Sequence, residues 1–104
     1  MIDIDIDFTA ELWVSGGPGA WHFVTLPTDI ADQIRFFRER HYGFGTIRVK
    51  VRLNGTEWKT SLFPDKDSNS FLLPIKADVR KKEGLRVGAS ISISIFMEVD
   101  EYKV

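Results

Sequence analysis

The first residues of the chain alternate strictly between apolar and polar side chains. In "MIDIDIDFTAELWV", isoleucines at every second position share one face with Phe8 and Val14, and aspartates lie on the other face. Because successive side chains of a strand point to opposite faces, this period predicts a half-buried strand over residues 2–14. The sequence "SGGPG" (15–19) interrupts the alternation as a hairpin turn, and "WHFVTL" (21–26) resumes it as a second strand.

A helix is predicted over residues 28–41. Thr28 is suited to cap its N-terminus, and Asp29 places a negative charge in the first turn, where the helix dipole favours it. Gly43 is expected to end the helix. The apolar residues of one helix face, at i, i+4 and i+7, are Ile30, Ile34 and Phe37.

The strongest local signal is the sequence "TIRVKVRLNGTEWKTSLF". Asn54-Gly55 between two alternating runs predicts a β-hairpin with a two-residue type I′ turn. That turn fixes the register of the strands. The predicted cross-strand pairs are Leu53 with Thr56, Arg52 with Glu57, Val51 with Trp58, and Lys50 with Lys59. The predicted core residues of the hairpin are Ile47, Val49, Val51, Leu53, Trp58 and Leu62.

The remaining segment predicts a strand at "SFLL", a helix over residues 76–83 capped by Gly84, and a final strand at "SISISIFMEV". The apolar side chains of the final strand are Ile91, Ile93, Ile95, Met97 and Val99. "FVTLP" and "FLLP" each place a strand and Leu-Pro before a helix, which suggests two similar halves.

The predicted fold is therefore mainly β with two short helices, in the order β-β-α-β-β-β-α-β, as a single domain over residues 1–104. A small six-stranded barrel, closed or partly closed, suits this pattern, because closure removes the exposed edges that long apolar strands would leave.

Composition narrows the function classes. The chain of 104 residues is 43% hydrophobic and 28% charged, as in ordinary globular proteins, and it has no cysteines for disulfides or thiolate chemistry. No run is long enough for a membrane span, and the N-terminus lacks the pattern of a secretory signal, so we expect a cytoplasmic protein with no membrane partner. The net charge of −1 disfavours nucleic acid as a partner.

The sequence "PDKDSNS" resembles the start of a calcium loop, with Asp65, Asp67 and Asn69 at alternate positions. The calcium motif also needs glycine at its sixth position and a carboxylate at its twelfth, where this chain has Ser70 and Lys76. Asp, Asn and Ser are common in tight turns. We predict a hairpin loop and no metal site here.

Other catalytic and cofactor patterns are also incomplete. "SGGPGAW" joins two strands, whereas a phosphate-binding glycine loop opens a helix. His22 lies in an apolar strand and His41 near a helix end, and no sequence motif ties a serine to either of them. We predict no catalytic residues and no cofactor, although a catalytic set formed only in space stays open.

Two sets of side chains are candidate ligand or partner surfaces. The first, the basic ladder, lies on the exposed face of the hairpin and consists of Arg48, Lys50, Arg52 and Lys59. Like charges directly opposite each other are unfavourable, so an anionic partner binds the ladder or another strand neutralises it. We favour neutralisation by the acidic row of the first strand, Asp3, Asp5 and Asp7. The second set consists of Trp13, Trp21, His22 and Trp58.

Several segments together resemble a known bacterial family. The sequences "WHFVTLP", "GFGTIRVKV", "NGTEWKTSLFP" and "FLLPIKADVRKKEGLRVG" are similar to the domain of unknown function 1905 over nearly the whole chain. The resemblance implies a double-split β-barrel, as in swapped-hairpin transcription factors of the antitoxin type, and no established activity. The family tends to have Gly-Asp before the last strand, where this chain has Gly88-Ala89.

Three hypotheses follow for function. The first is a stand-alone, non-enzymatic binding or interaction module for a small-molecule or protein partner, with a homodimer as one form. The second is a nucleic-acid-binding module, by analogy with the barrel transcription factors. The third is a small hydrolase-like enzyme. A pocket lined by Trp21, His22 or Trp58 would favour a small ligand or an enzyme, and a flat basic face on a symmetric dimer would favour DNA.

Overall fold

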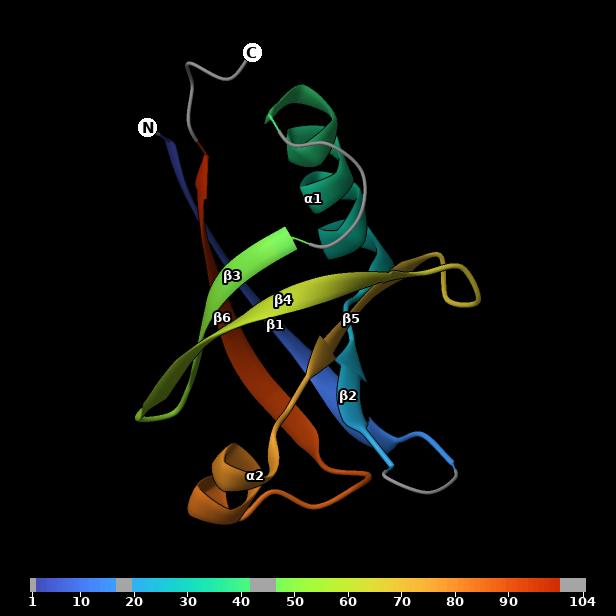
Figure 1. Ribbon diagram of the computed structural model, residues 1–104, viewed down its shortest axis with the longest axis vertical. Helices are drawn as coiled ribbons and strands as arrows, with labels where there is room; N and C mark the ends of the chain where they lie inside the picture. Colours follow the sequence, from blue (N-terminus) through green and yellow to red (C-terminus); the bar gives the residue numbers. More distant parts are fainter. Residues whose placement is uncertain (1, 17–19, 42–46, 100–104) are drawn as a thin grey trace.

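The computed structural model describes residues 2–16, 20–41 and 47–99, without the side chains of 2–4, 37–41, 98 and 99. Gly43, which was predicted to end the first helix, lies outside the described residues. The elements are β1 (Ile2–Val14), β2 (His22–Thr25), α1 (Thr28–His41), β3 (Ile47–Leu53), β4 (Thr56–Asp65), β5 (Ser70–Pro74), α2 (Ala77–Glu83) and β6 (Ser90–Val99) (Figure 1). The predicted element order is confirmed.

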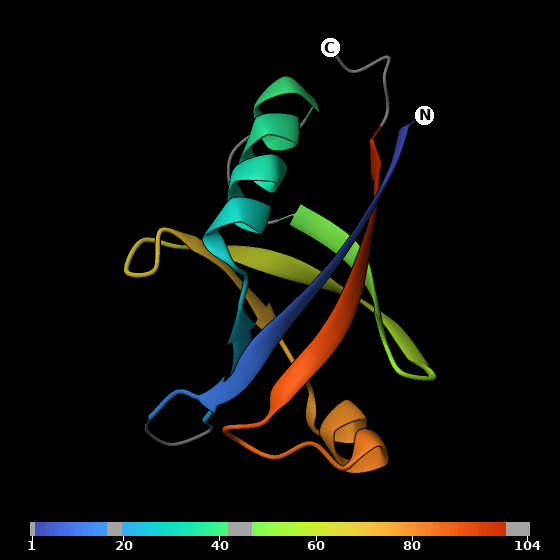
Figure 2. The same cartoon turned by 180° about the vertical axis from the view of Figure 1, so that it is seen from behind.

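The six described strands form a closed antiparallel barrel in the order β1-β2-β5-β4-β3-β6. Two of the long strands, β1 and β4, each pair first with one neighbour and then with another. β1 pairs with β6 as far as Glu11 and with β2 from Leu12 onward. β4 pairs with β3 as far as Leu62 and with β5 from Phe63 onward. Figure 2 shows β1 and β6 running side by side along the barrel.

The barrel consists of two halves with the same connectivity, as the sequence suggested. Exchanging β1, β2 and β3 with β4, β5 and β6 leaves the strand order around the barrel unchanged. α1 follows β2, and α2 follows β5. The two helices lie at opposite ends of the barrel in Figures 1 and 2.

The core follows the alternation of the strands. On β6, Ile91, Ile93, Ile95 and Met97 are all buried, and the serines between them face outward or are only partly covered. The predicted core residues of the hairpin are likewise buried. Because side chains alternate between the faces of a strand, a shift of one residue would expose all of these apolar side chains, so burial fixes the register.

The hairpin between β3 and β4 has the predicted register, with Lys50 opposite Lys59 and Arg52 opposite Glu57. Its turn differs from the prediction. Asn54 has a φ of 54°, but Gly55 does not share the left-handed region. A type I′ turn needs positive φ at both central residues, and positive φ at the first alone is the pattern of type II′. Contacts from α2 to both sides of this turn, described below, accompany the change.

The two helices contribute unequally to the core. Among the described residues of α1, Ile30, Ala31 and Ile34 are buried, whereas α2 buries only Val79. α2 begins one residue later than predicted, at Ala77. The short helix therefore covers its end of the barrel with few side chains.

Candidate ligand pocket

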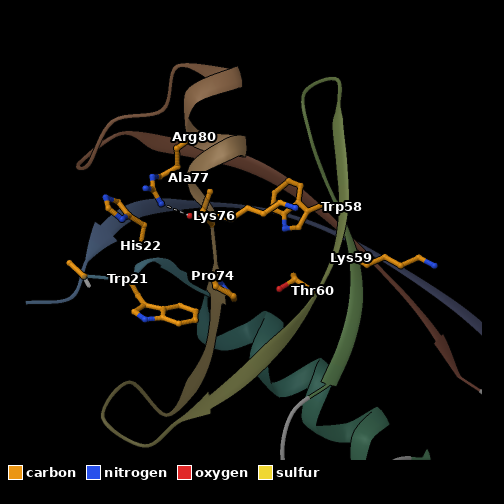
Figure 3. A pocket seen from close by; sticks show the side chains of 11 residues that line it. Trp21, His22, Trp58, Lys59, Thr60, Pro74, Lys76, Ala77 and Arg80 are labelled. Atoms are coloured by element: carbon orange, nitrogen blue, oxygen red, sulfur yellow. Dashed lines mark hydrogen bonds between the residues drawn. The ribbon is translucent and has the colours of Figure 1, made fainter. Parts of the chain in front are cut away.

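A pocket of about 350 Å³ lies where α2 approaches β2, β4 and β5. We call it the α2 pocket. Its lining residues are Ala20, Trp21, His22, Trp58, Lys59, Thr60, Pro74, Ile75, Lys76, Ala77 and Arg80. Figure 3 shows Trp21 and Trp58 on opposite sides of the pocket, with the α2 residues along one edge.

Strand pairing sets the position of these side chains. β2 lies beside β5, and the Ile75 N–H donates a hydrogen bond of 2.9 Å to the His22 carbonyl oxygen. Trp58 points inward from β4 and is only 8% exposed, so it belongs both to the core and to the pocket wall. The aromatic wall is therefore fixed by the barrel itself.

The charged groups of the α2 pocket are cationic. Lys76 is exposed and Arg80 is half-buried, and no aspartate or glutamate is among the lining residues. Arg80 Nη1 donates a hydrogen bond of 2.7 Å to the Ile75 carbonyl oxygen, which fixes the guanidinium at the edge of the pocket. Lys59 contributes to the lining, but its side chain extends away from the pocket (Figure 3).

His22 carries a buried nitrogen without a partner. Nδ1 is shielded from solvent and makes no hydrogen bond among the described residues. A buried polar atom left unpaired costs about 1–3 kcal/mol. Such atoms are rare in folded proteins, and strained or unsatisfied groups concentrate at functional sites.

A contact at the far end of α2 holds the helix against the hairpin. Glu83 accepts one hydrogen bond from Asn54 Nδ2, at 3.0 Å, and a second from the Thr56 hydroxyl. The bond from Thr56, followed by that from Asn54, lowers the pKa of Glu83. Because Thr56 and Trp58 lie on the same strand, this contact also holds α2 beside the strand that carries Trp58.

The two other aromatic candidates differ, because Trp21 lines the α2 pocket and Trp13 does not. Trp21 is 61% exposed and stacks on Phe23, with ring centroids 6.1 Å apart. The Trp13 indole N–H donates a hydrogen bond of 2.9 Å to Thr25 Oγ1, and its ring packs on Phe23 at 5.2 Å. Trp13 is thus a structural residue and does not line the α2 pocket. A second, mostly apolar hollow is lined by Ser15, Trp21, Phe23, Phe63 and Leu72.

The basic ladder lies elsewhere, on the outer face of β3 and β4, and two of its members are paired. Glu57 accepts a hydrogen bond of 2.9 Å from Arg52 Nε, and it forms ion pairs of 2.8 Å with Arg52 and 3.4 Å with Lys50. Both cations also lie over the Phe96 ring, at 6.0 Å for Lys50 and 5.0 Å for Arg52. The bond from Arg52 is the main cause that lowers the pKa of Glu57.

A strand separates Asp5 and Asp7 of the acidic row from the ladder. β6 lies between β1 and β3, with Phe96 between Asp5 and Lys50 and with Ser94 between Asp7 and Arg52. Asp7 accepts a hydrogen bond of 2.6 Å from the Ser94 hydroxyl. The side chain of Asp3 lies outside the described residues. Among the described side chains, Glu57 is therefore the carboxylate that pairs with the ladder, because the barrel places a strand between the ladder and both Asp5 and Asp7.

The calcium-like segment is a hairpin loop, as predicted. β4 and β5 pair on either side of it, and Asp65 Oδ2 accepts hydrogen bonds from the Ser68 N–H and hydroxyl, at 3.1 and 2.6 Å. Within the described residues, no three His, Asp or Glu side chains are grouped as metal ligands. The serines of β6 also lie on strand faces away from the α2 pocket lining.

Comparison with known families agrees with the resemblance seen in the sequence. A family model described as a domain of unknown function, DUF1905, matches residues 8–95. The chain belongs to the DUF1905 family. No match was found among curated proteins. In the described part of the chain, no helix is long and apolar enough to cross a membrane.

Within this DUF1905 barrel, the Gly88-Ala89 turn is held by backbone bonds. The Gly88 N–H donates to the Leu12 carbonyl at 2.8 Å, and the Leu12 N–H donates to the Ala89 carbonyl at 2.9 Å. Gly88 has a φ of 91°, which favours glycine. The turn therefore forms with alanine at position 89 and needs no side-chain cap there.

Of the eight candidate residues taken from the sequence, the fold brings Trp21, His22, Trp58 and Lys59 to one pocket. Sequence reasoning missed the lining residues that β5, α2 and the link between them contribute, which are Pro74, Ile75, Lys76, Ala77 and Arg80, and also missed Ala20 and Thr60. The available signal was the pair of basic residues around the start of the second helix. A basic residue on a short helix is common on protein surfaces, so this signal is weak without the pairing of β2 and β5.

Proposed function

We propose that this protein is a binding module that holds a small molecule in the α2 pocket. The observation that carries the proposal is the convergence of Trp21, His22 and Trp58 on one concave site beside two cations, one in α2 and one just before it. Ligand sites are typically concave, mostly apolar and lined by a few well-placed polar groups, with volumes of about 300–1,000 Å³. The α2 pocket fits this description.

Binding without catalysis is favoured by the chemistry of the lining. His22 is the one imidazole there, and the lining includes no carboxylate to orient it and no serine or cysteine to act as a nucleophile. Among the lining side chains, the Thr60 hydroxyl is the group most similar to a serine nucleophile. A hydrolase of the usual kind needs a nucleophile, a base and an orienting group within hydrogen-bond reach of one another.

The nucleic-acid alternative has less support. Lys50 and Arg52 of the basic ladder already share Glu57 and lie over Phe96. Phosphate contacts to these residues would have to compete with Glu57. Nucleic-acid binding relies on unpaired basic side chains that release counterions from the phosphates.

The resemblance to the family supports further proposals about the form of the barrel, the extent of the domain and the location of the protein. We infer a double-split form of the barrel, a single domain over residues 1–104, and a cytoplasmic protein from a bacterium. A homodimer or a protein partner is compatible with this proposal, because the α2 pocket is built from one chain.

The test is to fill the α2 pocket with a larger side chain. Ala77 is exposed and lines the site, so Ala77→Phe places a ring in the pocket without removing a described contact. Lys81→Phe makes a similar change on the same helix outside the lining. A fragment library is screened at millimolar concentration by amide and indole NMR shifts on the wild-type protein. Hits that shift the Trp21 indole and are lost in Ala77→Phe but kept in Lys81→Phe support the proposal. Hits that bind Ala77→Phe equally well contradict it.

A further inference from the structure

We infer that the α2 pocket selects organic oxyanions: a flat ring held against Trp21 and Trp58, carrying a carboxylate or phosphate that Arg80 and Lys76 bind. This inference rests on the proposed function and adds the class of ligand. It follows from the charge, the geometry and the aromatic walls of the site.

The charge around the site has one sign. Lys76 and Arg80 line it, whereas the two acidic residues of α2 do not. Glu83 is engaged by Asn54 and Thr56, and Asp78 is exposed and outside the lining. Among the described residues, neither cation of the pocket has a carboxylate partner. An anionic ligand would supply the charge that the protein does not.

Arg80 is oriented before a ligand arrives. One of its five N–H donors is bonded to the Ile75 carbonyl, so the guanidinium plane is held while other donors stay available. A planar guanidinium matches two oxygens of a carboxylate or phosphate, and a side chain already ordered loses less entropy on binding. Lys76, on the same edge, adds a flexible second charge.

The aromatic walls favour a flat group on the anion. Trp21 exposes 61% of its surface, which is unusual for so large an apolar side chain. It lies across the pocket from Trp58 (Figure 3). A planar ring between these walls would cover the Trp21 indole, and aromatic pairs prefer stacked or edge-to-face contacts.

His22 is suited to a part in the same contact. The Nδ1 atom is shielded, so a ligand reaches it when the imidazole turns about its Cβ–Cγ bond, a torsion with a broad, two-fold preference. The turned ring would offer an imidazole N–H to an oxyanion in the α2 pocket. In the bound state, the ring would then have no unpaired nitrogen.

The experiment titrates four probes into ¹⁵N-labelled protein: phenyl phosphate, benzoate, inorganic phosphate and uncharged benzamide. The protein has three tryptophans, and their indole N–H signals report on separate places. Trp21 and Trp58 line the pocket, whereas the Trp13 indole is bonded to Thr25 and serves as an internal control. Trp21→Phe assigns the Trp21 signal.

We expect phenyl phosphate or benzoate to shift the signals of Trp21 and Trp58 but not that of Trp13, and to bind more tightly than benzamide or inorganic phosphate. The tighter of the two ring anions identifies the acid group. Lys76→Gln should weaken the binding about tenfold, as the loss of a charged hydrogen-bond partner does. Lys81→Gln removes a lysine charge from α2, outside the lining, and should leave affinity unchanged.

Other results would overturn the inference. Equal binding of benzamide, unaffected by Lys76→Gln, would exclude selection for anions while leaving a small-ligand pocket. Inorganic phosphate bound as tightly as phenyl phosphate would exclude the role of the ring. Equal losses in Lys76→Gln and Lys81→Gln would show general electrostatic attraction instead of a site. Failure of all four probes, with neutral fragments still bound in the α2 pocket, would reject the oxyanion class alone.

Discussion

The basic ladder and the α2 pocket are built from similar residues but differ in how their polar groups are satisfied. On the ladder, Lys50 and Arg52 share Glu57 and lie over Phe96. In the α2 pocket, Lys76 and Arg80 lie beside Trp21 and Trp58 with no carboxylate in the lining, and a buried nitrogen of His22 is unpaired.

This difference shows why a basic, aromatic sequence pattern is a poor guide to a site. The two strands of the hairpin place a carboxylate among the cations of the ladder, so the charges of that surface are partly paired within the protein. The α2 pocket joins residues of three strands and a helix, and its groups are satisfied only in part. Unsatisfied groups in a concave place indicate a ligand more strongly than exposed charge does.

The largest expected effect is on the free energy of unfolding, and it should differ between the aromatic residue of the α2 pocket wall and the one beneath the basic ladder. Trp58→Ala removes a buried side chain and should lower the free energy of unfolding by about 3–5 kcal/mol. Phe96→Ala removes a ring that is only partly buried and should cost clearly less. Urea unfolding of both variants measures the difference. A loss for Phe96→Ala as large as that for Trp58→Ala would show that the ladder face is as much a part of the core as the pocket wall.

The second prediction concerns the unpaired nitrogen. His22→Phe keeps a flat ring and removes the unsatisfied atom, so the free energy of unfolding should rise by about 1 kcal/mol. The same variant should bind the ring anions less tightly, because it has no ring nitrogen to donate. Denaturation midpoints and the NMR titrations check the two effects. A destabilised variant would indicate that His22 contributes through packing and that its nitrogen costs little.

The third prediction uses pH and salt. The folded-state pKa values of Glu57 and Glu83 are both lowered, by Arg52 and Thr56 respectively as the main causes. Their stabilisation is therefore fully present above the unfolded-state pKa of about 4.3 and is lost as pH falls through the lower folded-state value. We expect Glu57→Gln and Glu83→Gln each to lower the denaturation midpoint at pH 7 and to flatten its fall in acid.

Salt should distinguish the two carboxylates. Glu57 pairs with cations, so the effect of Glu57→Gln should shrink in high salt, whereas Glu83 bonds to a hydroxyl and an amide and its effect should persist. Glu83→Gln should also weaken ligand binding, because the contact holds α2 beside the hairpin. Equal salt dependence of the two variants would contradict this assignment.

The smallest effect is expected on the ladder itself. Lys59 faces Lys50, and like charges directly across strands are unfavourable, so Lys59→Ser should stabilise the protein by about 0.2–1 kcal/mol in low salt and by less in high salt. Lys50→Ser removes the same repulsion but also breaks the exposed ion pair with Glu57, so it should stabilise the protein less than Lys59→Ser does. Unfolding of each single variant and of the pair tests this. A strongly destabilised double variant would restore the acidic row of β1 as the partner of the ladder.

Much of the fold followed from periodicity in the sequence. Alternation placed the strands and their buried faces, and Asn54-Gly55 set the register of the hairpin, because these signals depend on neighbours in the chain. Even there, the type of turn was wrong. Glu83, 29 residues beyond Asn54 in the sequence, bonds to both sides of that turn, and local propensity does not include such a contact.

The order of strands and the site were decided by the tertiary structure. The alternating pattern of β1 gave no sign that β6 would separate Asp5 and Asp7 from the ladder, since strand order depends on closing the barrel. Trp21 and His22 were chosen from the sequence as residues of interest, but Arg80 was not, because only the pairing of β2 with β5 and the short length of α2 bring it beside them. The sequence by itself determined which faces of the strands are buried, because that depends on local alternation. Only the closed barrel decided which surface is left with unpaired groups, because that depends on contacts between residues far apart in the chain.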